Sequence, residues 1–236
     1  MRGRGLRVLG HVGDGGGLMD TDVMDVGALM LRFPDDEVMA ARPRIATAVQ
    51  DMRRSPARDL LVPAVRWWAA LAADRLREEY VRTFDLSRRT SLDLTYATYG
   101  DRRQRGIALL ALRHRYREAG VEPDGTTELA DHLPMALEFA GTGHPDGEAI
   151  LRDHLPVIEL LRLGLEEAGS PFAPVLAAVV QELPPLTSEE RDLVRSMARE
   201  GPPTEAIGLE PFAPPEVMPE PTGRLACAGA TAGGIR

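Results

Sequence analysis

The sequence predicts an all-α fold. Between residues 22 and 200, apolar side chains recur at intervals of three or four, the spacing that places them on one face of a helix. Capping residues and glycines bound these stretches, and one short segment alone alternates like a strand. Hydrophobic residues make up 44% of the 236-residue chain and charged residues 27%, as is usual for globular proteins. We therefore expect a single-domain helical bundle over residues 22–200.

Prolines mark the first predicted helices. The apolar pattern from Val23 to Met30 predicts one helix, which Pro34 ends. Asp35 and Asp36 open the next, because negative charge is favourable at a helix N-terminus. We expect Pro43 to divide this second helix, since proline removes a backbone hydrogen bond.

A long apolar stripe follows. The helical pattern begins near Ser55, resumes at Pro63 and continues through Leu76, Tyr80 and Phe84, which are four residues apart. The stripe is most simply core. It could instead form the wall of a groove that accepts the apolar face of a partner helix, with the Tyr80 hydroxyl offered to the bound backbone.

The middle of the chain contains the exception to the helical pattern. Leu92–Tyr96 alternates with period two, but a lone strand would have no pairing partner, so we expect an extended connector. Asp101 is predicted to cap a helix over residues 102–119, which Gly120 ends. One face of this helix carries Ile107, Leu110 and Ala111.

Four more helices are predicted in the C-terminal half. Thr187 and Glu190 form a capping-box pattern, in which each satisfies a backbone N–H group at the start of the last helix. Glycines close three of the four, because they adopt the left-handed conformation easily. The predicted ranges are 132–140 before Gly141, 146–168 before Gly169, 171–182, and 188–199 before Gly201.

Both ends of the chain depart from this pattern. Residues 1–21 are rich in glycine, and residues 201–236 contain seven prolines. We expect flexible extensions there, outside the domain. Leu209, Phe212 and Met218 nevertheless place apolar side chains in the second extension, so we infer that it competes with a peptide for a groove on the domain.

Composition restricts the compartment and the partners. No apolar stretch approaches the ~20 residues that cross a bilayer, and no export signal is evident, so we expect a cytoplasmic protein without a membrane span. Cys227 is the lone cysteine, which leaves no disulfide framework. The net charge of −8 would repel nucleic acid and favours a basic partner such as a cationic peptide. The arginines at positions 82, 88, 89, 102, 103 and 105 are expected to be solvated or paired with Glu78, Glu79 and Asp85.

A near repeat is the best candidate for chemistry. The sequence Asp-His-Leu-Pro occurs at 131–134 and again at 153–156. Carboxylate and imidazole together bind divalent ions, which would suit a metal-dependent hydrolase. However, neighbouring residues on a helix point ~100° apart, and no third histidine stands nearby. The simpler interpretation is a helix start with aspartate as the N-cap and proline in the first turn, to which the first copy could add a partner contact.

Residues 80–106 resemble the signature segment of the NarJ proteins, the nitrate reductase delta subunits or molybdenum cofactor assembly chaperones. Ala130 and Tyr99 depart from that family, where proline and histidine are common. Three further segments agree with it, namely Leu129–Phe139, Leu160–Pro171 and Gly208–Met218.

The resemblance implies the all-helical fold of the TorD and DmsD redox-enzyme maturation proteins and a chaperone that is not an enzyme. It implies binding of the N-terminal peptide of the apo catalytic (alpha) subunit of respiratory nitrate reductase. It also implies help in inserting molybdopterin guanine dinucleotide, with no cofactor bound stably by the chaperone itself and no place in the final enzyme. A general helical scaffold is the remaining alternative. The candidate peptide-binding residues are Tyr80, Phe84, Asp85, Arg88, Tyr96, Tyr99, Asp131, His132, Pro134 and Glu138.

Overall fold

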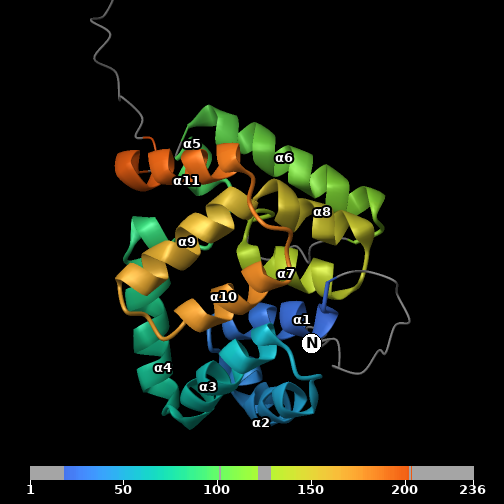
Figure 1. Cartoon of the computed structure of the whole chain (residues 1–236), viewed down its shortest axis with the longest axis vertical. Helices are drawn as coiled ribbons and strands as arrows, with labels where there is room; N and C mark the ends of the chain where they lie inside the picture. Colours follow the sequence, from blue (N-terminus) through green and yellow to red (C-terminus); the bar gives the residue numbers. More distant parts are fainter. Residues whose placement is uncertain (1–18, 101, 122–128, 202, 204–236) are drawn as a thin grey trace, which may run out of the picture. The chain divides into compact units, whose positions relative to one another are not determined.

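The computed structural model describes residues 19–100, 102–121, 129–201 and 203. These ranges form α-helices joined by short connections and contain no strand (Figure 1). The prediction of an all-α fold is confirmed. The helices are α1 (Thr21–Met30), α2 (Asp36–Asp51), α3 (Pro56–Ala70), α4 (Ala73–Tyr80), α5 (Tyr96–Tyr99), α6 (Arg103–Glu118), α7 (Leu133–Gly141), α8 (Pro145–Asp153), α9 (Leu155–Glu167), α10 (Ala173–Gln181) and α11 (Ser188–Glu200), with a π-helical turn η1 (Val81–Asp85) and a 3₁₀ turn η2 (Arg88–Thr90) after α4.

Helix α1 lies in the core against α3, α7 and α10 (Figure 1). Glycines allow this close approach. A Cβ atom at Gly27 would lie 3.1 Å from Val179 of α10, and one at Gly141 would lie 1.9 Å from the Asp25 carboxylate of α1. Gly141 is therefore a packing residue and the last residue of α7, one position beyond the predicted range, and it lacks the left-handed conformation of a stop glycine. Gly143, with a φ of 75°, follows the helix instead.

The prediction that Pro43 divides its helix is wrong. Helix α2 continues through Pro43, and α3 continues through Pro63. A proline inside a helix costs ~3 kcal/mol. Val38, Ile45 and Val49 lie on both sides of Pro43 and are all buried. Since burial of each such side chain contributes ~1.5–3 kcal/mol, packing outweighs the lost hydrogen bond.

Two predicted helical stretches are each divided in the structure. Helix α3 ends at Ala70 and α4 begins at Ala73, so the stripe through Tyr80 belongs to α4 and η1. The predicted helix over 146–168 is interrupted at His154, between α8 and α9. Pro156 has no N–H to donate to the carbonyl of Arg152, so the junction between α8 and α9 lacks that hydrogen bond.

Four of the predicted helix ends are confirmed. Thr187 and Glu190 form the capping box, because the Glu190 N–H donates to Thr187 Oγ1 at 3.2 Å and the Thr187 N–H donates to the Glu190 carboxylate at 2.7 Å. Gly120, Gly169 and Gly201 follow their helices with φ values of 72°, 62° and 71°. These left-handed conformations confirm the three predicted stops.

The alternating segment Leu92–Tyr96 does have a pairing partner. The Leu94 N–H donates to the carbonyl of Asp131 at 2.9 Å, and the Leu133 N–H donates to the carbonyl of Leu92 at 2.8 Å. A short antiparallel bridge therefore joins the connector to the start of α7. The segment is a connector as predicted, but it is not extended throughout, because Leu94 and Thr95 form a turn and Tyr96 begins α5. The expectation that it pairs with nothing is also wrong.

Several predictions concern residues outside the described ranges. These are the cap at Asp101, the character of the two extensions and the competition of the C-terminal extension with a peptide. They stay predictions, as do the domain boundaries at residues 22 and 200. Within the described ranges, no helix has the length and apolar character that a bilayer crossing requires.

Candidate functional site

Tyr80 and Phe84 belong to a buried aromatic cluster. Each is 5% exposed, and their ring centroids lie 4.9 Å apart. Phe172 lies 4.9 Å from Phe84, and Phe33 contacts Tyr80 edge-on at 5.5 Å. The Tyr80 hydroxyl donates to the carbonyl of Leu31 at 3.1 Å. This hydroxyl, which in the groove interpretation would contact a bound peptide, therefore binds the backbone of the chain itself.

The π-helical turn η1 continues α4 directly after Tyr80. Such turns are rare and occur frequently at functional sites. The Thr90 hydroxyl donates to the carbonyl of Thr83, which ties η1 to η2. Asp85 and Arg88 are exposed at this place. The turn therefore brings these two predicted site residues to the surface while Phe84 stays in the core.

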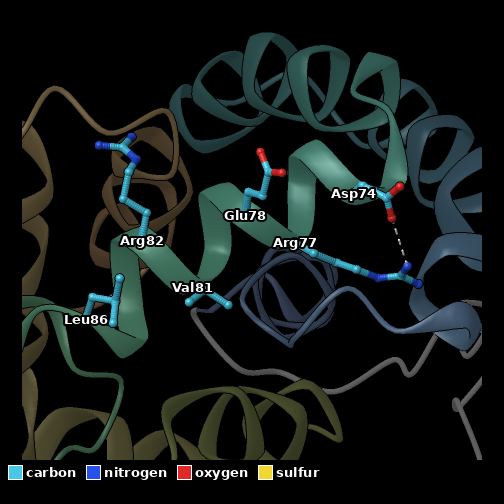
Figure 2. Close-up of a pocket in the computed structure, with 6 residues that line it drawn as sticks. All are labelled: Asp74, Arg77, Glu78, Val81, Arg82 and Leu86. Atoms are coloured by element: carbon cyan, nitrogen blue, oxygen red, sulfur yellow. Dashed lines mark hydrogen bonds and ion pairs between the residues drawn. The ribbon is translucent and has the colours of Figure 1, made fainter.

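An open depression of about 430 Å³ follows the outer side of α4 and η1 (Figure 2). Leu86 is 77% exposed and adds an apolar side chain next to Val81. The two arginines at the depression are neutralised, because Arg77 pairs with Asp36 and Asp74 and Arg82 pairs with Glu79. The last pair was one of those expected from the sequence. The depression is lined by Asp74, Arg77, Glu78, Val81, Arg82 and Leu86.

Asp131 lies at the centre of a second, polar cluster. Its side chain is 0% exposed. One carboxylate oxygen, Oδ2, accepts from the Thr95 N–H at 3.1 Å, from the Thr95 hydroxyl and from Arg105 Nη2 at 3.3 Å. Asp131 therefore ties together the connector, the first turn of α6 and the start of α7.

The N-cap interpretation of the two aspartates is wrong. His132 is the N-cap of α7 and provides no side-chain hydrogen bond there, while Asp131 faces the connector. In the second copy Asp153 ends α8 and pairs with Arg115 of α6 at 2.7 Å. Both carboxylates turn to cationic or N–H partners elsewhere in the fold. Pro134 does lie in the first turn of α7, as predicted.

The charges of the polar cluster are closely paired. Arg105 Nη2 donates to Asp93 at 2.8 Å, and its guanidinium lies 5.4 Å from the ring centroid of Tyr96. His132 Nδ1 lies 3.5 Å from Asp93 Oδ1. Burial by itself raises the pKa of Asp93, but hydrogen bonds from His132 and Arg105 outweigh it and lower that pKa. Asp93 therefore stays ionised at neutral pH.

Two buried oxygens at this cluster lack a hydrogen-bond partner within the described ranges, Tyr116 Oη and Asp131 Oδ1. Burial, and then the negative charge of Asp131, raise the pKa of Tyr116, so the phenol stays protonated. A buried polar atom without a partner costs ~1–3 kcal/mol. Asp131 Oδ2 therefore accepts three hydrogen bonds, whereas Asp131 Oδ1 and Tyr116 Oη have no partner in the described ranges.

The remaining predicted site residues lie on α5 and α7. Tyr99 is half-buried in α5, like Tyr96, and Glu138 is exposed on α7. The second Asp-His pair serves the α8–α9 junction, where His154 Nδ1 lies 2.8 Å from the carbonyl oxygen of Ile150. In the described part of the chain, no three His, Cys, Asp or Glu side chains gather to hold a metal ion.

Four residues of the polar cluster were not predicted from the sequence, namely Asp93, Thr95, Arg105 and Tyr116. Arg105 was grouped with solvated arginines, but its side chain is only 14% exposed. Asp93 and Thr95 lie within the NarJ-like segment and were treated as connector. One feature of the sequence could have indicated them. Asp93 and Arg105 lie in the NarJ-like segment 80–106, and Asp131 lies in a second NarJ-like segment, Leu129–Phe139. Their pairing depends on the bridge between the segments, which no periodicity reveals.

Comparison with known proteins gives a consistent picture. The family model described as nitrate reductase delta subunit matches residues 44–178. A probable nitrate reductase molybdenum cofactor assembly chaperone NarJ of Bacillus subtilis is 36% identical over 111 residues, which are 47% of this chain and 60% of that protein. The corresponding NarJ chaperone of Escherichia coli is 29% identical over 112 residues, 47% of each chain.

A further relative is longer. The nitrate reductase-like protein NarX of Mycobacterium tuberculosis is 34% identical over 158 residues, which are 66% of this chain and 24% of that protein. The matches thus span about a quarter to three fifths of the lengths of these relatives. They confirm the resemblance to the NarJ proteins that the segment 80–106 indicated.

Proposed function

Because the chain belongs to the nitrate reductase delta subunit family, we propose that it is an assembly chaperone for the catalytic (alpha) subunit of nitrate reductase. It binds the N-terminal peptide of the apo subunit in the cytoplasm and assists insertion of molybdopterin guanine dinucleotide into that subunit. It catalyses no reaction and leaves the finished enzyme. The observation that carries this proposal is that relatives in two organisms bear the name of nitrate reductase molybdenum cofactor assembly chaperone.

The depression along α4 and η1 is the surface that suits such a peptide best. Val81 and Leu86 are the apolar residues that line it, and Leu86 exposes 77% of its surface. Full burial of one leucine contributes ~1.5–3 kcal/mol, so an amphipathic peptide gains from covering it. Glu78 lines the depression but pairs with Arg75 at 2.8 Å. Asp85 is exposed beside Leu86, and its carboxylate favours a basic side chain on the peptide.

The buried candidates then act by holding this surface in place. Tyr80 and Phe84 anchor α4 and η1 to the core through Leu31 and Phe172. Asp131 fixes the connector that follows η2. In this proposal they are positioning residues, and the contacts with the peptide are made by exposed side chains around Leu86.

Calorimetric titration with the N-terminal peptide of the catalytic subunit, and with a scrambled peptide of the same composition, tests the function. We expect saturable binding of the authentic peptide only. No binding of either peptide would overturn the proposal, and equal binding of both would favour a general scaffold.

The location is tested by Leu86→Gln, with Leu163→Gln as the matched control because Leu163 is also exposed, at 39%, but lies on α9. Leu86→Gln should weaken peptide binding about tenfold, equivalent to ~1.4 kcal/mol, while the control binds like the original chain. Circular dichroism establishes that both variants stay folded. Equal affinities for the two variants would remove the depression as the peptide site.

A further inference from the structure

Helix α6 presents an apolar face to solvent that the fold does not use. Ile107 is 66% exposed and Leu110 is 65% exposed, and one helical turn separates them. The helix is anchored from its other side, where Leu112 and Tyr116 are buried. Figure 1 shows α6 at the margin of the described fold, beside α8. The exposed face is therefore a surface of the folded domain and not a gap in its core.

Cationic side chains flank this apolar face. At 3.6 residues per turn, Arg103 and Arg117 project on the same side as Ile107 and Leu110, one at each end. Both arginines are exposed and pair with no carboxylate in the described ranges, unlike Arg115, which pairs with Asp153. The face thus combines an apolar centre with two guanidinium groups that have no carboxylate partner among the described residues, in a chain whose net charge is −8. His114 and Glu118 lie on the same side of the helix and pair with each other at 3.2 Å.

We propose that this α6 face, consisting of Arg103, Ile107, Leu110 and Arg117, binds an acidic polypeptide segment of a partner protein that carries apolar side chains at helical spacing. The apolar centre matches the stripe of such a segment, and guanidinium groups bind carboxylates in a bidentate manner. The surface lies on a different helix from the proposed peptide site on α4 and η1. Its two arginines, Arg103 and Arg117, would repel a basic peptide.

Other polyanions fit this face less well. A nucleic acid gains nothing from Ile107 and Leu110, and the net negative charge of the chain opposes it. An anionic membrane would have to be held by two apolar side chains, which bury less apolar area than a single acyl chain, and one such chain anchors a protein only marginally. A protein segment uses both the apolar centre and the flanking charges.

Fluorescence anisotropy with the full chain tests the proposal. The probe is a labelled 18-residue peptide with leucines at i, i+3, i+4 and i+7 and glutamates elsewhere, compared with a scrambled peptide of the same composition. We expect the patterned peptide to bind at least about tenfold more tightly than the scrambled one. The double variants Ile107→Gln/Leu110→Gln and Arg103→Gln/Arg117→Gln should each lose this preference.

A matched control is Leu193→Gln/Arg199→Gln, which changes an exposed leucine and an exposed arginine on α11. It should bind like the original chain, and circular dichroism should show all variants folded. The proposal is overturned if the α6 variants bind like the original chain, or if duplex DNA or phosphatidylserine vesicles bind this face and the patterned peptide does not. Binding that appears only after replacement of Glu205, Glu210, Glu216 and Glu220 by glutamine would assign the face to that segment of the chain and also overturn it.

Discussion

The residues Asp131 and Asp153 stand in the same four-residue motif, yet their environments are opposite. Asp131 is 0% exposed and accepts hydrogen bonds from Thr95 and Arg105. Asp153 exposes 59% of its side chain and has one ion-pair partner, Arg115. The difference arises from the bridge between the connector and α7, which buries the first copy only.

Replacing Asp131 should therefore cost far more stability than replacing Asp153. Asp131→Ala leaves the buried Thr95 donors without an acceptor and removes a buried charge beside Arg105, which keeps Asp93 as a partner. We expect a loss of about 3 kcal/mol in the free energy of unfolding, measured by urea titration. Asp153→Ala should cost under ~1 kcal/mol, because exposed pairs contribute little. Equal losses would show that the cluster around Asp131 does not stabilise the fold as the geometry indicates.

Among the helices, two glycines make a contrasting pair. Gly147 of α8 packs on α7, where an added Cβ atom would lie 2.6 Å from the Cα of Ala140. Gly106 of α6 has no atom within 4 Å of that position. We expect Gly147→Ala to destabilise the protein by ~1–3 kcal/mol through overpacking. Gly106→Ala should stabilise it by ~0.4–1 kcal/mol because alanine restricts the unfolded chain. Thermal unfolding measures both, and a destabilising Gly106→Ala would contradict the exposed position of that face.

The start of α11 should respond to acid through Glu190. Hydrogen bonds from Arg152 and from the Thr187 N–H lower the pKa of Glu190 from 4.5 to about 2. A lowered carboxyl pKa contributes stability above the unfolded value, and this contribution is lost as the pH falls from 4.5 towards 2. Glu190→Gln should lower the urea midpoint at pH 7, and the difference from the original chain should shrink to nothing near pH 2. Glu189→Gln, at an exposed neighbour in the same turn, is the control variant.

The helices themselves were largely predictable, and their divisions were not. Capping residues such as Thr187 and stop glycines such as Gly120 act locally, so the sequence around them is sufficient. The continuation of α2 through Pro43 depends on burial of side chains against α3, which a local pattern does not contain. The interruption at His154 was not predicted, because the apolar residues of α8 and α9 follow one continuous helical spacing in the sequence.

The candidate site was predictable only in part. Resemblance to a family pointed to Tyr80, Phe84, Asp131 and His132, but the structure places the first two in an aromatic cluster and the last two in a polar one. No local sequence pattern marked Asp93 or Arg105 as site residues. Their place in the polar cluster depends on a bridge between segments that are 36 or more residues apart in the sequence. Exposure, which decides between contacting and positioning roles, also depends on the whole fold.

For the whole molecule, the net charge of −8 should govern how fast a basic peptide associates with this chain. Opposite charges accelerate encounter, and screening removes this effect as the Debye length falls from ~30 Å at 0.01 M to ~8 Å at 0.15 M ionic strength. Stopped-flow fluorescence should show the association rate of the N-terminal peptide falling about tenfold across this range, with little change in dissociation, because steering acts before contact. A peptide whose basic residues are replaced by glutamine is the control and should associate at a rate that hardly depends on salt. Equal salt dependence of both peptides would show that contacts formed after encounter, and not the charge of the whole chain, set the rate.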